Sequence, residues 1–191
     1  MDKSDIITLP NESLRQRSRK VGIITDSIRQ LVQGMQDATL SWEDSRNHEV
    51  GVALAAVQVN RRLRIIIIRN NFEDKSDRGF QVYINPEVTK AYGELADDFE
   101  GCLSVKNIYG KVPRYDKVKI KALNLQGKQI RLTAEGFLAR VLQHEIDHTK
   151  GVVFIDHIKD KPDAFFKLMD DGSLEPMDYT KHIKDNPKLW E

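Results

Sequence analysis

Hydrophobic residues in the segment 11–40 recur at intervals of three and four positions: Val21, Ile24, Ile28, Leu31, Met35 and Ala38. This spacing places them on one face of a helix, and Asp26 with Ser27 provides a helix start inside the segment. We therefore predict a short helix followed by a longer one. The segment 41–49 is polar apart from Trp42 and has no periodicity, so it is predicted to be a surface loop.

Four segments rich in β-branched residues are predicted to be strands: 63–68, 80–84, 118–123 and 129–132. Apolar residues alternate with lysines in the third, which is typical of a strand with one solvent-facing side. The sequence 125–128 resembles a hairpin turn, so the last two strands should be antiparallel. Because the strands follow one another without a helix between each pair, we predict an α+β fold rather than a parallel doubly wound sheet.

A second helix is predicted to begin after Thr133 and to end at Gly151. One stripe of this helix faces the core and consists of Phe137, Val141, His144 and His148. We expect an N-terminal helical segment before the strands and a C-terminal appendage after this helix. From residue 160 onward the chain is rich in charge, and we predict a main domain at 1–159, which should carry any active site, and an extension at 160–191.

The overall charge does not indicate a nucleic-acid or membrane partner. Lys and Arg total 30 against 29 for Asp and Glu, so no direct DNA binding is expected. The longest apolar run, 50–57, contains one Gly and is far shorter than the roughly 20 residues of a membrane-spanning helix. The start of the chain shows no secretory signal, so we expect a cytoplasmic location.

The segment 143–148 has the pattern HExxH, which carries the first candidate chemistry. Since a helix repeats every ~3.6 residues, His144 and His148 lie on one face and can bind one metal ion. Glu145 is adjacent and can act on water there without occupying a coordination position. The alternative is a helix with two ordinary, partly buried histidines.

Cys102 is the best candidate for a third ligand, because a catalytic metal commonly has three protein ligands. It is the single cysteine of the chain and lies between predicted strands. A thiolate with two imidazoles suits Fe(II), Zn(II) or Ni(II). A buried, inert thiol is the alternative. The other histidines, His48, His157 and His182, are expected in mobile or distal segments, with His48 simply solvated.

Three segments, in this order, resemble the motifs of peptide deformylase: GVALAAVQ at 51–58, EGCLS at 100–104 and QHEIDH at 143–148. The resemblance extends from about residue 5 to residue 157. It implies a compact α+β fold in which antiparallel strands pack around the central HExxH helix. It also implies an enzyme that removes the formyl group from the N-terminal formylmethionine of nascent chains and releases formate. It also implies N-formylmethionyl peptides as partners and a transient contact with the ribosome.

The resemblance further implies roles for individual residues. Cys102, His144 and His148 would bind the metal, with Fe(II) as the expected ion and Zn(II) or Ni(II) as substitutes. Glu145 would be the acid/base. The side-chain amide of Gln58 and the backbone N–H of Leu103 would bind the oxyanion, and the peptide would be flanked by Val52, Ala53 and Gly101.

The first motif departs from the family at two positions, with Ala53 in place of Gly and Val57 in place of Pro. The methyl group of Ala53 could narrow the peptide cleft, and Val57 restores an N–H that Pro lacks. Neither change removes a catalytic group. The reaction expected from the resemblance is therefore unchanged.

Two other functions share some of these features. A zinc endopeptidase also uses HExxH, and His157 is the only nearby downstream candidate for its third ligand. A metal-bound but weakly active relative could serve as a nascent-chain or ribosome binding module.

The roles of Arg114 and Asp147 each have two interpretations. Arg114 either braces the cysteine loop through Glu100 or lies on the surface, and Asp147 either supports the metal site or is solvated.

Overall fold

The computed structural model describes residues 1–46 and 48–190. Its N-terminal part contains two 3-10 turns, Lys3–Asp5 and Glu12–Arg15, and a long helix, α1 (Asp26–Asp44). The start of α1 confirms the prediction, but the helix continues four residues into the segment predicted to be a loop. The reason is tertiary: Glu43 is buried and pairs with the buried Arg69, a partner that a local pattern cannot reveal. Residue 47 of the predicted loop lies outside the described residues.

Strands in the described part of the chain form one antiparallel sheet in the order β1-β2-β3-β4-β6-β7, with β5 also paired to β4. The strands are β1 (Ala53–Ala55), β2 (Ile65–Arg69), β3 (Phe80–Cys102), β4 (Val105–Leu123), β5 (Gln129–Glu135), β6 (Phe165–Leu168) and β7 (Leu174–Pro176). The predicted hairpin turn joins β4 to β5. The antiparallel α+β class is thereby confirmed.

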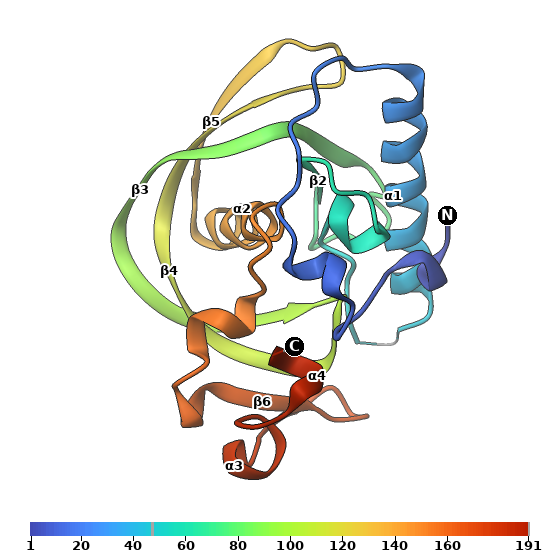
Figure 1. Cartoon of the computed structure of the whole chain (residues 1–191). Coiled ribbons are helices and arrows are strands. Elements are labelled where there is room, and N and C mark those ends of the chain that lie inside the picture. Colours follow the sequence, from blue (N-terminus) through green and yellow to red (C-terminus); the bar gives the residue numbers. More distant parts are fainter. Residues whose placement is uncertain (47, 191) are drawn as a thin grey trace.

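Strands β3 and β4 are far longer than the segments predicted from β-branched residues. The central part of β3, residues 91–99, is solvent-exposed apart from the half-buried Tyr92 and contains no β-branched residue, so it lacks both the composition and the alternation that identify a strand. Several register shifts interrupt the pairing of the two strands. Such irregularities bend a strand pair, and Figure 1 shows β3, β4 and β5 curving around the helix α2.

Helix α2 spans Gly136–His148 and therefore begins later than predicted. Thr133 is paired with Lys119 in the sheet rather than capping the helix, and the chain turns from β5 into α2 at Gly136, whose φ of 59° favours glycine. Phe137 is 46% exposed, so its predicted place in the core is wrong. The rest of the stripe, from Val141 onward, is buried as predicted.

The isoleucine run of β2 separates two hydrophobic clusters. Ile66 and Ile68 face the cluster around α2, and Ile65 and Ile67 face the cluster under α1. A strand buried on both faces has a continuous apolar sequence. Strand β2 thereby lies between α1 and α2.

The segment after residue 160 continues the sheet. Strand β6 pairs with residues 108–110 of β4, and the β6–β7 hairpin is followed by the short helices α3 (Tyr179–His182) and α4 (Pro187–Trp190). A third cluster packs this segment against the 3-10 turn Phe154–Ile158. The boundary at 159/160 stays a prediction. In the described residues, no helix is both long and apolar enough to cross a membrane.

Candidate active site

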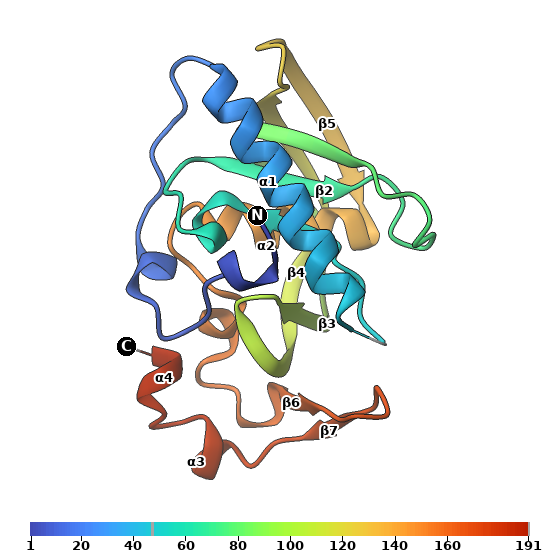
Figure 2. The same ribbon diagram turned by 90° about the vertical axis from the view of Figure 1, so that its right-hand side faces the viewer.

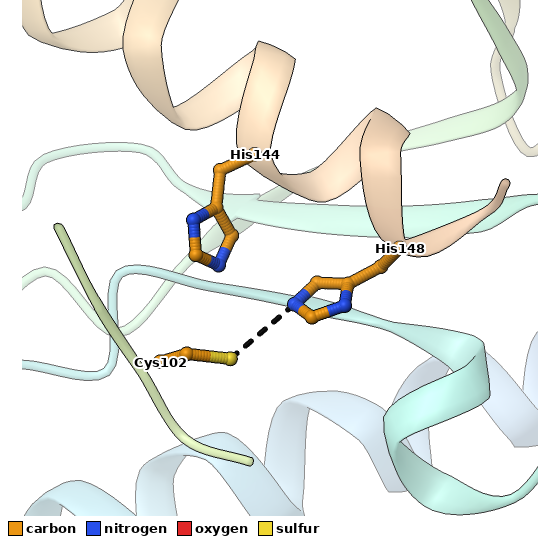
Figure 3. A group of neighbouring side chains, drawn as sticks. All are labelled: Cys102, His144 and His148. Carbon is orange, nitrogen blue, oxygen red and sulfur yellow. Dashed lines mark hydrogen bonds between the residues drawn. The ribbon is translucent and has the colours of Figure 1, made fainter. Parts of the chain in front are cut away.

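Cys102, His144 and His148 converge at the centre of the molecule. Cys102 ends β3, and the two histidines lie one turn apart on α2. Their potential ligand atoms all lie within 4.8 Å of one another. Figure 3 shows both imidazoles extending from α2 toward the thiol, with the Sγ of Cys102 3.3 Å from the Nε2 of His148. One thiol and two imidazoles in this arrangement could hold a metal ion.

The two histidines have different surroundings. The Nδ1 of His144 lies 2.9 Å from the Oε2 of Glu100, which leaves its Nε2 available. Burial alone would lower the pKa of His144, but Cys102 and Glu100 outweigh burial and raise this pKa above its usual value. Burial and the proximity of His144 lower the pKa of His148, whose Nδ1 is buried without a hydrogen-bond partner in the described structure. A neutral imidazole is the form that binds a metal.

Glu100 is the centre of a buried charged cluster behind His144. Its carboxylate accepts hydrogen bonds from Arg114 and Arg140 at 2.9 Å each. Burial opposes ionisation, but His144 and Arg114 hold the pKa of Glu100 at about 2. The carboxylate is therefore charged at neutral pH and keeps the ring of His144 in one orientation.

Arg114 is only 5% exposed, so it is not a surface arginine. It donates to Glu100 and also to Asp147 on α2, at 2.5 Å. Asp147 is likewise buried and lies 2.8 Å from the Nε2 of His157. Thus the expectation that His157 would be distal is wrong, because the turn after α2 brings it back against the helix. Arg114 connects the end of β3 to the histidine helix.

Glu145 projects into the same cavity as His144. Burial raises the pKa of Glu145 to about 7; His144 opposes the rise and Glu100 adds to it. Its Oε2 atom is buried and has no hydrogen-bond partner among the described residues. A carboxyl group with a pKa near neutrality can both accept and donate a proton at that pH.

Gln58 reaches the cysteine from the 3-10 turn that follows β1. Its Oε1 accepts from the backbone N–H of Ala55, and its Nε2 donates to the Oγ of Ser104 at 3.1 Å. The same Nε2 is 3.5 Å from the Sγ of Cys102. These contacts orient the amide with its N–H₂ group toward the thiol. The sequence analysis assigned no role to Ser104, although this residue belongs to the EGCLS motif that contains Cys102.

A cavity of about 270 Å³ opens beside these groups. Val52 and Ala53 line it from the start of β1, and Gly101 with Leu103 lines it from the end of β3 and the turn that follows; we call these two segments the walls of the cavity. Ala53 is buried and packs with the cluster around α2, and Val57 is buried in that cluster as well. The structure thus brings to one region all nine residues to which the resemblance assigns a role.

Comparison with known proteins identifies the family. A family model described as Polypeptide deformylase matches residues 3–163. The chain belongs to the peptide deformylase family. It is 38% identical to the peptide deformylase of Thermomicrobium roseum over 159 residues, which is 82% of this chain and 86% of the relative. It is 42% identical to peptide deformylase 1 of Clostridium perfringens over 147 residues, covering 77% and 92% of the two chains.

Solved structures of peptide deformylases have the same fold. The enzyme from Synechococcus elongatus, solved in complex with actinonin, matches with a TM-score of 0.73 and 35% identity over 82% of this chain and 80% of that one. The enzyme from Thermotoga maritima matches with a TM-score of 0.70 and 30% identity over 80% and 95%. The family similarity expected from the three motifs is confirmed, and the activity is hydrolysis that removes an N-terminal formyl group.

Several cavity residues were not predicted from the deformylase motifs: His48, Glu49, Phe99, Tyr109 and Phe137. They lie in segments without a motif, and the tertiary fold alone brings them together. Phe137 carried a partial signal, since it belongs to the apolar stripe of α2; its ring packs edge-on against Phe72, with centroids 4.8 Å apart. His48 is exposed, as expected, yet it lies at the cavity.

Proposed function

We propose that Cys102, His144 and His148 bind one divalent metal ion in this deformylase, so that α2 is a metal-binding helix at the centre of the sheet. The donor set fits such an ion: two buried imidazoles and a thiol meet, and Glu100 fixes one ring by its Nδ1. We propose Fe(II) as the ion, with Zn(II) or Ni(II) as substitutes. When bound, the ion polarises the formyl carbonyl and activates water for attack.

Glu145 is the proposed acid/base. Its carboxylate accepts the proton released when water attacks the formyl carbon, and then delivers it to the nitrogen of the departing amine. Both steps need a group whose pKa is near the working pH, and burial raises the pKa of Glu145 to about 7. The free, buried Oε2 atom is consistent with this role, because a carboxylate that is fully hydrogen-bonded to protein would be a poorer base.

The oxyanion is proposed to be bound by the side-chain amide of Gln58 and the backbone N–H of Leu103. The amide is already oriented by Ala55 and Ser104, so little reorganisation is needed in the transition state. Leu103 directly follows Cys102, so its N–H lies close to the proposed metal site. A single donor of this kind typically contributes about 3 kcal/mol to transition-state stabilisation.

The substrate is proposed to be the N-terminus of a formylmethionyl nascent chain. This peptide would lie between the segment of Val52 and Ala53 on one side and Gly101 on the other. These residues line the two walls of the cavity beside Glu145, which supports this path. We further propose that the enzyme acts in the cytoplasm during protein synthesis, with a transient contact to the ribosome.

The convergence of the three potential ligands next to Glu145 is the single observation that carries the proposal. The test is elemental analysis of anaerobically purified protein combined with formate release from formyl-Met-Ala-Ser. Wild type should hold about one equivalent of metal, and Cys102→Ser should lose most of it together with activity. Unchanged metal content in Cys102→Ser would remove this residue from the ligand set.

The two alternatives are not favoured. His157 is hydrogen-bonded to Asp147 and lies outside the group of three potential ligands, which removes the candidate third ligand of an endopeptidase. A catalytically silent binding module would not need a buried Glu145 and an oriented Gln58 in the same cavity.

A further inference from the structure

Glu49 and Tyr109 connect the two walls of the active-site cavity by a hydrogen bond. Glu49 lies in the segment that leads into Val52 and Ala53, and Tyr109 lies on β4. The hydroxyl of Tyr109 donates to the Oε1 of Glu49 at 2.9 Å, and both residues line the cavity. The Tyr109 ring covers Gly101, since a Cβ atom on that glycine would lie only 2.6 Å from the ring. The bond therefore joins the wall of Val52 and Ala53 to the wall of Gly101.

The Glu49 end of this bond is held by a second contact. The Nη1 of Arg46 lies 3.3 Å from the Oε2 of Glu49, so the two carboxylate oxygens have different partners. The Glu49 side chain is only 14% exposed. An ion pair and a hydrogen bond in a partly buried position restrict the carboxylate more than either contact alone.

The Tyr109 end is supported by the β6–β7 hairpin. Phe166 of β6 is the register partner of Tyr109, and its ring packs edge-on against the cavity residue Phe99, with centroids 4.9 Å apart. The ammonium group of Lys111 lies 5.2 Å from the Phe99 ring centroid and 5.3 Å from that of Phe166. The hairpin thus supports the wall that carries Gly101.

The same hairpin also reaches the opposite wall. A Cβ atom on Gly172, in the turn between β6 and β7, would lie 3.2 Å from the Cγ of His48. Figures 1 and 2 show the tip of this hairpin next to the segment that follows α1. One element therefore contacts both sides of the cavity at the position where the Glu49–Tyr109 bond crosses it.

We propose that the Glu49–Tyr109 hydrogen bond, supported by the hairpin, is a clasp that sets the distance between the two walls. An extended peptide that pairs with backbone on both sides needs walls about 10 Å apart, twice the ~4.8 Å spacing of strands. If the two walls are already held at this distance in the free enzyme, less conformational entropy is lost when the peptide binds. Glu49 and Tyr109 are then positioning residues that favour longer peptides over formylmethionine alone. This inference rests on the proposed peptide path.

The experiment compares formyl-Met-Ala-Ser with N-formylmethionine as substrates of wild type, Tyr109→Phe, Glu49→Ala and Glu49→Gln. Tyr109→Phe and Glu49→Ala should raise KM for the tripeptide about five- to tenfold, the loss expected for one hydrogen bond of about 1 kcal/mol. The ratio of kcat/KM for tripeptide to that for formylmethionine should fall by the same factor. Glu49→Gln keeps an acceptor oxygen and should retain most of the wild-type ratio.

Tyr115→Phe is the matched control, because it removes a hydroxyl from another tyrosine of β4 that does not line the cavity. Its ratio should equal that of wild type. If Tyr109→Phe and Glu49→Ala both kept the wild-type ratio of kcat/KM values, the clasp proposal would be wrong, while the proposed function would stand. The clasp proposal would also be wrong if Glu49→Gln and Glu49→Ala lowered this ratio equally, because the charge of Glu49 rather than its hydrogen bond would then matter. If wild type released no formate from either substrate, both proposals would fail.

Discussion

The Nδ1 of His144 lies 2.9 Å from the Oε2 of Glu100, and the same carboxylate binds Arg114 and Arg140. One residue of the cysteine motif thus orients a histidine of the helix motif. The two motifs that the sequence shows separately are parts of one buried network. Arg114 extends this network to Asp147 and His157.

Glu100→Gln should weaken metal binding about 10- to 100-fold, the usual effect of losing a carboxylate that orients a ligand histidine. The amide keeps the shape of the side chain but loses the charge that balances two buried arginines. The measurement is Zn(II) affinity by competition with a chelator. Asp98→Asn, which changes an exposed carboxylate of the same strand, is the control and should bind like wild type. Unaltered Zn(II) affinity in Glu100→Gln would show that the contact has no role in metal binding.

The buried pair of Arg69 and Glu43 should contribute strongly to stability. The guanidinium is 0% exposed and the carboxylate 3%, with the closest N and O atoms 2.8 Å apart. Arg69→Met would leave Glu43 buried and without its cation, which typically costs about 3–5 kcal/mol of unfolding free energy.

The neighbouring pair of Arg78 and Asp44 provides the control, because those side chains are 45% and 58% exposed. Arg78→Met should leave the urea midpoint nearly unchanged. If urea unfolding showed equally small effects for both arginine variants, the importance assigned to the Arg69 pair would be wrong.

Glu87 should make stability depend on acid pH. Hydrogen bonds from Lys121 and Lys20 lower its pKa from 4.5 to about 2. Because the folded state lowers this pKa, the stabilisation is fully present above about pH 4.5 and is lost as the pH falls through 2. The difference in unfolding free energy between wild type and Glu87→Gln should therefore be largest near neutrality and fall to roughly 40% of that value at pH 3.

Urea unfolding at pH 6 and pH 3 measures this difference. Glu94→Gln, on the same strand, changes an exposed carboxylate without an ion pair in the described structure and is the control for the exchange of a carboxylate for an amide. A Glu87→Gln difference that grows toward low pH would contradict the assigned direction of the pKa shift.

The sequence predicted those features that depend on local patterns. The start of α1, the hairpin between β4 and β5 and the spacing of His144 and His148 follow from periodicity, turn residues and helix geometry. The end of α1 could not be predicted in this way, because Glu43 is helical and buried as a result of its ion pair with Arg69, which is distant in sequence. Cavity residues such as Tyr109 were also missed, since only the curvature of the sheet brings them to the site.

Glu145→Gln is the decisive variant for the proposed chemistry, because it changes only the proposed acid/base and keeps the side-chain shape. The measurement is formate release from formyl-Met-Ala-Ser, with metal content determined on the same preparation. We expect a metal content equal to that of wild type and a loss of turnover of about 10²- to 10⁴-fold. Near-normal formate release by the metal-loaded variant would contradict the assignment of Glu145 as the acid/base.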